Sequence, residues 1–192
     1  MSSYPKRLIE VDLPIKKISD HSRREKSIRQ GHIATLHIWW ARRPLAACRA
    51  VLCASLWPDP ADENCPESFR KSSVAAIIKF VKESKGLVTY DHASSDVRVK
   101  WEKIEKNPSI INVDTNEGLL ALREALFDFI ADFANWDNIS NSHYLETARF
   151  LTRTAHEALD GEKGTRPMVV DPFAGGGSIP LEVLAQMYSL QT

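Results

Sequence analysis

The sequence has few cysteines and no long apolar run. Cys48, Cys53 and Cys65 include no C-x-x-C pair, which argues against a disulfide framework and a zinc site, so free thiols are expected. His32 and His37 are five residues apart, not the four that place two ligands on one helix face, so no metal site is predicted; structural or phosphate-contacting roles fit them better. No stretch approaches the roughly 18 apolar residues of a membrane span, and residues 1–12 do not resemble a signal peptide. We therefore expect a cytoplasmic protein that does not bind a membrane.

The formal net charge is zero, but the charge is not spread evenly along the chain. Residues 1–58 contain eleven Lys/Arg and four Asp/Glu, a net charge of +7, and the remainder carries −7. A basic segment attracts phosphate because binding releases counterions. DNA is therefore a predicted partner, with contacts expected from Arg23, Arg24, Lys26, Arg29 and Arg42 and further candidates in Arg43 and Arg49. The alternative is a solvated basic face, or pairing with the acidic half of the same protein.

Apolar residues recur at helical spacing along most of the chain, which predicts a mainly helical fold. Pro44 suits the first turn of a helix that Trp57-Pro58 ends, and Asp114 with Glu117 has the spacing of a capping box. Helices are expected at residues 19–29, 44–56, 66–85, 99–106, 114–133 and 142–159, after an extended segment at residues 8–13. The apolar stripes of these helices, with Trp101 and Trp136, indicate a core rather than a ligand site. Trp39-Trp40, beside Arg42, is expected to pack on the core, on a base or on an adenine ring.

Three consecutive glycines near the C-terminus separate an expected strand from an expected helix. Residues 168–171 form a short apolar run that Pro172 ends, and Ser178 can cap a helix at residues 178–190. The glycines allow positive φ and close approach of a ligand to the backbone. No lysine follows Gly177, which excludes a phosphate-binding Walker A loop, and Pro180 fits the dinucleotide fingerprint poorly. The remaining alternatives are a site of another class and a glycine-rich connection without a ligand.

This stretch resembles the D-P-F-x-G-x-G motif of the S-adenosylmethionine-dependent DNA amino-methyltransferases. The matching residues are Asp171, Pro172, Phe173, Gly175 and Gly177. The resemblance implies an α/β Rossmann-like fold that starts at residue 166, and a loop that cradles the methionine end of S-adenosylmethionine. The cofactor-binding residues implied by it are Asp171, Pro172, Phe173, Ala174, Gly175, Gly176, Gly177 and Ser178.

The N-terminal strings RLIEVDLP, SRREKSIRQGH and GHIATLHIWWARRPL resemble the domain of unknown function at the start of large adenine-specific DNA methylases. Together the two resemblances cover residues 6–58 and 168–184. They imply that Arg43 and Pro44, at a helix start, complete the cofactor pocket. The implied organisation is a basic methylase-associated segment at residues 1–58, a helical insertion at 59–165, and an incomplete methyltransferase domain at 166–192. The fold expected for this chain is thus mainly α, with one Rossmann-like strand-loop-helix unit at its end.

The catalytic chemistry of that family is missing from the sequence. Amino-methyltransferases use an Asp/Asn/Ser-Pro-Pro-aromatic loop to accept the amine hydrogens and stack on a flipped base, but the chain has no adjacent prolines. No second strand follows to hold the ribose. We expect the N-terminal portion of an adenine-N6 (or cytosine-N4) methyltransferase, with the rest of that polypeptide as a partner, and S-adenosylmethionine binding that is weak or absent in this chain alone. The alternative is a non-enzymatic nucleic-acid or protein interaction module with a vestigial glycine loop.

Overall fold

The structure is a computed structural model that describes residues 4–27, 43–87 and 95–188, and it is mainly helical, as the sequence predicts. Its helices are α1 (Ile15–Ser27), α2 (Leu45–Leu56), α3 (Glu67–Ser84), α5 (Ser95–Lys106), α6 (Asn116–Phe133), α7 (Ser142–Ala158) and α8 (Ser178–Met187). Short 3-10 turns lie at η1 (Leu8–Glu10), η3 (Pro108–Ile111) and η4 (Trp136–Asn138). Within the described ranges, no helix combines the length and the apolar character that crossing a lipid bilayer requires.

Helix boundaries follow local chemistry closely where proline or a capping side chain sets them. Pro44 and Pro66 immediately precede α2 and α3, because a residue with φ near −60° and no N–H suits a helix start. The cap of α6 lies one residue later than predicted: the hydroxyl of Thr115, not Asp114, accepts from the Gly118 amide at 3.1 Å. α5 begins at Ser95, four residues before the predicted start.

The N-terminal segment differs from its prediction. Residues 8–10 form the 3-10 turn η1 instead of an extended strand, and α1 begins at Ile15 rather than near Ser19. The Leu8 amide donates to the Trp57 carbonyl at 3.0 Å, and the Asp59 amide donates to the Lys6 carbonyl at 2.8 Å. Two bonds of this kind hold the segment against the end of α2, which is a tertiary contact that local sequence does not encode.

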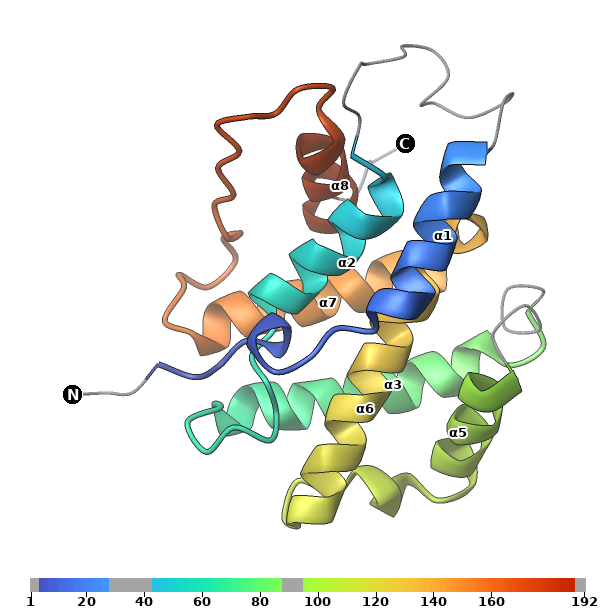
Figure 1. Cartoon of the computed structure of the whole chain (residues 1–192). Coiled ribbons are helices and arrows are strands. Elements are labelled where there is room, and N and C mark those ends of the chain that lie inside the picture. The colour runs from blue at the N-terminus through green and yellow to red at the C-terminus, as the bar shows by residue number, and fades with distance from the viewer. Residues whose placement is uncertain (1–3, 28–42, 88–94, 189–192) are drawn as a thin grey trace.

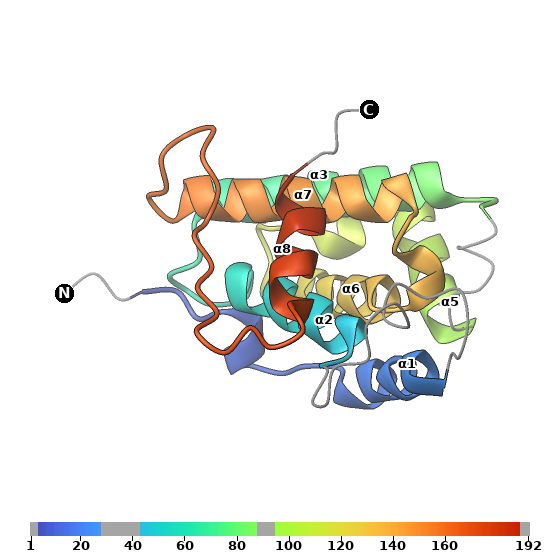
Figure 2. The ribbon, with the colours of Figure 1, turned by 90° about the horizontal axis from the view of Figure 1, so that it is seen from above.

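The core is one hydrophobic cluster that runs from Leu8 to Ala155. Its centre is aromatic: Phe80 meets Trp101, Phe129 and Tyr144 edge-on, with ring centroids 5.2, 5.0 and 4.8 Å apart. Such edge-to-face pairs are a favoured arrangement of aromatic rings. α3 and α7 lie side by side along one face, and α6 crosses beneath them (Figure 2). Trp101 is 1% exposed, so its predicted core role is confirmed.

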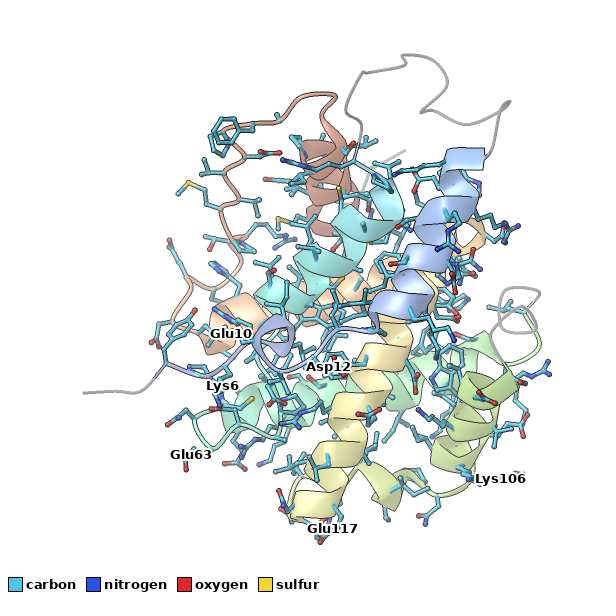
Figure 3. All side chains as sticks on the ribbon, in the orientation of Figure 1. Lys6, Glu10, Asp12, Glu63, Lys106 and Glu117 are labelled. Atoms are coloured by element: carbon cyan, nitrogen blue, oxygen red, sulfur yellow. The ribbon has the colours of Figure 1, made fainter. Side chains whose placement is uncertain are left out.

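α6 spans the molecule between two ends. Glu117, at its start, lies at the same end as Lys106 of α5, whereas α8 lies at the opposite end (Figure 3). α2 lies between α1 and α8 and packs against both (Figure 1). Residues 171–177, which we call the glycine loop, lead directly into α8. Because α8 packs against α2 and α7, the glycine loop lies at the end of the molecule opposite the turn η3.

The predicted strand at residues 168–171 is not observed. After α7 ends at Ala158, the chain runs along the outside of the molecule before it turns into α8 (Figure 1). Residues 165–171 of this connection form no strand pairing with other described residues. Met168 is 88% exposed and Val170 is 73% exposed. A strand needs a neighbouring strand for its backbone hydrogen bonds, and no second strand lies in the described part of the chain. The described residues thus show a loop and a helix here, but not the strand of the expected Rossmann-like element.

Candidate functional site

The glycine loop is a compact turn held by its own backbone. The Asp171 carboxylate accepts from the Phe173 amide at 3.0 Å, and the Gly177 amide donates to the Ala174 carbonyl at 2.8 Å. Gly175 and Gly177 have φ of 54° and 76°, in the left-handed region that favours glycine. Residues 172–176 are exposed, with the Phe173 ring 80% accessible. The loop therefore presents bare backbone to its surroundings.

α8 starts directly from this loop. Gly177 occupies the N-cap, and no side chain caps the helix among the described residues. Ser178, predicted to be the cap, is instead the first helical residue, and its hydroxyl donates to the Arg43 carbonyl at 2.9 Å. The first-turn amides of α8 and the positive end of its dipole are features that stabilise a bound anion.

The structure brings the two segments of the predicted pocket together across 128 residues of sequence. Arg43 contacts Asp171 at 3.4 Å between guanidinium and carboxylate, in addition to the Ser178 bond at its carbonyl. The Asp171 side chain is 9% exposed, and that of Arg43 is 51% exposed. The residues predicted to complete the pocket, Arg43 and Pro44, thus adjoin the loop that the sequence identified independently.

A buried ion pair fixes α8 on α2. The Arg49 guanidinium donates to both carboxylate oxygens of Glu182, at 2.9 and 2.8 Å, and to the Phe133 carbonyl at 2.8 Å; the two charged side chains are each 1% exposed. Gln186 extends this network to Cys53. Its side-chain nitrogen donates to the Glu182 carboxylate at 3.5 Å, and its side-chain oxygen accepts from the Cys53 thiol at 3.3 Å. Arg49 was predicted as a phosphate contact, and that prediction is wrong: its three donating nitrogens are occupied inside the protein. The available signal was its position between Cys48 and Leu52, on the apolar face of α2.

The N-terminus of α2 is already occupied by a side chain. The two carboxylate oxygens of Glu25 accept from the Leu45 and Ala46 amides, each at 3.0 Å, and Glu25 is 2% exposed. A carboxylate at a helix N-terminus stabilises the helix by satisfying free amides. Consequently, the Leu45 and Ala46 amides are not available to a ligand. The helix N-terminus without a side-chain cap in this region is that of α8.

The basic side chains of α1 lie on the surface and partly pair with acidic groups. Arg23 is within 3.3 Å of Asp20, and Arg24 is within 2.9 Å of Asp137 in η4. Lys26 is exposed. Pairing with the acidic half of the protein, the alternative to DNA contact, therefore holds for Arg24. The predicted residues Arg29 and Arg42, and also Trp39, Trp40, His32 and His37, lie outside the described residues.

The three cysteines are free and buried. Burial raises the pKa of Cys48 to about 11 and that of Cys65 to about 12, and it also raises the pKa of Cys53. The thiolate is the nucleophilic form of cysteine, so these groups are poorly suited to nucleophilic chemistry at neutral pH. Chemistry at this site thus depends on backbone donors, Arg43 and Asp171.

Comparison with protein families gives one match. Residues 12–79 are similar to the family described as a protein of unknown function (DUF1156). The match spans α1, α2 and most of α3, and it ends far before the glycine loop. No curated protein and no solved structure matches the chain.

Proposed function

We propose that this chain is the N-terminal portion of an S-adenosylmethionine-dependent DNA amino-methyltransferase that is specific for adenine N6. Its contribution is part of the cofactor site, and the methyl transfer itself requires residues that the chain does not contain. The motif D-P-F-x-G-x-G at residues 171–177 and the N-terminal strings support this assignment, and the match to a family of unknown function is compatible with it.

The observation that carries the proposal is the meeting of Arg43 with the glycine loop. Two segments that were singled out by separate sequence resemblances lie against each other, tied by the bonds from Ser178 and Arg43. An arginine next to an uncapped helix N-terminus suits a ligand carboxylate, such as that of the methionine moiety.

The described residues offer few contacts for the rest of the cofactor. Adenine and ribose would find few partners, because the described residues contain no second strand with an acidic residue for the ribose hydroxyls. Losing several contacts of about 1 kcal/mol each weakens binding by powers of ten, since every 1.4 kcal/mol is tenfold. We therefore expect this chain to bind S-adenosylmethionine with a dissociation constant in the millimolar range, too weakly for calorimetry to detect, and to transfer no methyl group to DNA.

Amide NMR spectra of residues 1–192, recorded during titration, test the proposal at that affinity. L-methionine and S-adenosylmethionine are expected to shift the amides of residues 171–178 and 43–46 in a saturable way. Adenosine, which lacks the amino acid, is the matched control and should leave them in place. Gly175→Val should abolish the shifts, because a branched side chain enters the space of the ligand and disfavours the positive φ. Thermal unfolding verifies that the variant remains folded.

Two results contradict the cofactor assignment. One is the absence of any shift at residues 171–178 at concentrations up to about 10 mM of either methionine compound, because a dissociation constant above that concentration corresponds to very weak affinity. The other is a shift of the same size with adenosine, which would place a nucleoside site where the proposal has an amino-acid site. Binding in the micromolar range, or methyl transfer by this chain alone, would show that the pocket is elsewhere in the chain and complete.

The proposal includes DNA as the partner of the basic segment. Binding to duplex DNA should be weak and independent of sequence. If about five phosphates are contacted, the slope of log affinity against log salt should be near −4 or −5. Arg23→Ala with Arg24→Ala should weaken binding and flatten that slope. Binding that is insensitive to salt, or unchanged in the double variant, would reject DNA contact by α1.

A second candidate is an interaction module in which the glycine loop binds no small molecule. The exposed apolar side chains favour it: Met168, Val170 and Phe173 are 73–88% exposed along one stretch of 6 residues. Contiguous apolar surface of this kind is typical of sites that another protein surface covers. The same exposure is compatible with the leading proposal if the remainder of the methyltransferase packs there, and the methionine titration separates the two.

A further inference from the structure

A cavity lies between α1, α5 and α6, away from the glycine loop. Its volume is about 220 Å³, and its walls include Lys17 and His21 of α1, Val97 of α5, and Ala131 and Asp132 of α6. α2 separates this side of the molecule from α8 (Figures 1 and 2). An apolar cavity of roughly 150 Å³ can hold benzene. This one is large enough for a single ring with a short substituent, and we call it the α1–α6 cavity.

Three carboxylates line the α1–α6 cavity, and they differ in their partners: Asp20 is paired with Arg23 at 3.3 Å. Asp128 is paired with Lys17 at 3.2 Å and with Lys100 at 2.7 Å, so its charge is fully compensated. Asp132, one helical turn later, is 7% exposed and forms no ion pair among the described residues. Its Oδ2 accepts from the Tyr144 hydroxyl at 2.5 Å, and no group of the described residues donates to its Oδ1.

Burial destabilises the ionised form of the Asp132 carboxylate. Desolvation raises the pKa of Asp132 to about 6, with the Tyr144 hydrogen bond and the charge of Lys17 acting in the opposite direction. The carboxylate therefore remains largely ionised at neutral pH in a site that is nine-tenths buried. Buried charges in proteins are usually paired. The free Oδ1 marks the position where a positively charged donor would be stabilised.

His21 supplies a second polar group at the cavity. Burial and the neighbouring Arg24 lower the pKa of His21, so its imidazole is neutral and one ring nitrogen can accept a hydrogen bond. The ring makes no hydrogen bond within the described part of the chain. Val97 and Ala131 complete an apolar wall. A metal ion is not favoured, because the described residues contain no group of three or more His, Cys, Asp or Glu side chains suited to one.

We propose that the α1–α6 cavity binds a small planar organic cation of one-ring size, an amidinium or aminopyridinium, which donates to Asp132 Oδ1 and His21 and packs its ring on Val97 and Ala131. The positive charge compensates the one carboxylate lining this cavity that has no ion-pair partner among the described residues. This site is independent of the glycine loop and of the proposed methyltransferase role. The chemistry of the ligand follows from the two acceptors, the apolar residues Val97 and Ala131, and the carboxylate of Asp132.

Titration with benzamidine, monitored by amide NMR at pH 7.5, tests the proposal. Benzamidinium should shift the amides of His21, Val97, Ala131 and Asp132, and bind at least tenfold more tightly than benzamide, its neutral isostere. Benzoate, the anionic isostere, should not bind. Asp132→Asn should weaken benzamidinium binding at least tenfold, because the amide keeps the shape and loses the charge. Asp114→Asn, just before the start of α6 and away from the cavity, is the matched control and should change nothing.

The pH dependence provides a further readout. Affinity should be constant above pH 7 and fall toward tenfold per pH unit once Asp132 takes up its proton. The other charged groups that face this carboxylate are Lys17, Asp20, His21, Lys100, Asp128 and Asp137. Protonation of His21 would weaken binding in the same direction, so His21→Gln is measured in parallel. Asp132→Asn should remove most of the pH dependence, and His21→Gln should leave it largely in place.

Three outcomes overturn the proposal. Equal affinity for benzamide and benzamidinium would make the cavity an apolar site without charge recognition. Unchanged benzamidinium affinity in Asp132→Asn would move the ligand elsewhere. Absence of binding up to 10 mM in the folded protein would show that Asp132 serves only to hold Tyr144. Circular dichroism and thermal unfolding of each variant ensure that a loss of binding is not a loss of fold.

Discussion

The buried pair Arg49–Glu182 is the contact whose removal has the most direct consequence for the candidate site. Glu182→Met removes the carboxylate and leaves the Arg49 guanidinium 1% exposed, with the Phe133 carbonyl as its one remaining hydrogen-bond acceptor within the described structure. Breaking a buried ion pair on one side typically costs about 3–5 kcal/mol. A small domain is stable by about 5–15 kcal/mol in total. The variant is therefore expected to lose a large part of its stability.

The double variant Arg49→Met, Glu182→Met distinguishes a lost pair from a lost packing surface. Because neither charge then remains buried, the free energy of unfolding of the double variant should lie within about 2 kcal/mol of the wild-type value. The sum of the losses in the two single variants should exceed the loss in the double variant by at least about 2 kcal/mol. The control is the exposed pair Lys71–Glu67, whose side chains are 66% and 71% accessible. Glu67→Ala should leave the free energy of unfolding nearly unchanged, because exposed helical ion pairs contribute little.

Urea unfolding followed by circular dichroism measures all of these free energies. The slope with denaturant verifies that the variants unfold as the same cooperative unit. Amide NMR of Glu182→Met should in addition show shifts in residues 171–178, because α8 loses its anchor to α2. A cost below about 1 kcal/mol for Glu182→Met, or additive single losses, would refute the reasoning: the pair would then be compensated by water and would not fix the loop.

Three further results are expected. For Asp132, the folded-state pKa of about 6 lies above the ordinary value of 3.8, so the folded protein binds this proton more tightly and stability falls as pH rises from about 4 to 6. Asp132→Asn should remove that loss, worth at most about 3 kcal/mol, as urea unfolding at pH 4.5 and 7.5 would measure; equal pH dependence in both proteins would contradict it. Gly118→Ala should destabilise by about 1–3 kcal/mol despite the better helix propensity of alanine, because the new Cβ would lie 2.0 Å from the Asn112 carbonyl oxygen; an unchanged thermal midpoint would argue against this contact. The three cysteines should react with a water-soluble thiol reagent only upon unfolding, and rapid labelling of the native protein would show that a thiol is accessible.

The helical part of the fold was predictable because its signals are local. Proline before α2 and α3, and the apolar spacing of α6 and α7, are each encoded within a single segment. The failures involve contacts made by distant residues. η1 is held by Trp57, and residues 168–171 resemble a strand in composition but find no neighbouring strand in the described chain. The apolar pattern of a strand thus indicates its preference and not whether a partner is present.

The segments of the candidate site were predictable, but the buried hydrogen bonds and ion pairs that hold them were not. The glycine loop and the Arg43-Pro44 helix start were identified from short strings, and the structure places them together. The use of Arg49 and Glu25 was not predicted, because a charged residue in a basic or polar segment has the same appearance whether it faces solvent or is buried. Arg49 lies among apolar neighbours on α2, and that context separates the two cases.

The contacts that hold α8 join residues about 130 positions apart, and this separation orders the assembly of the protein. The Arg49–Glu182 pair spans 133 residues, and the Ser178–Arg43 bond spans 135. Closing such long loops costs configurational entropy before any contact forms, so these pairs are expected to form late in folding. During synthesis, α2 emerges long before α8 does, and Arg49 lacks the Glu182 carboxylate until α8 packs against α2. The joining of the glycine loop to the start of α2 is therefore a late step in the assembly of the candidate site.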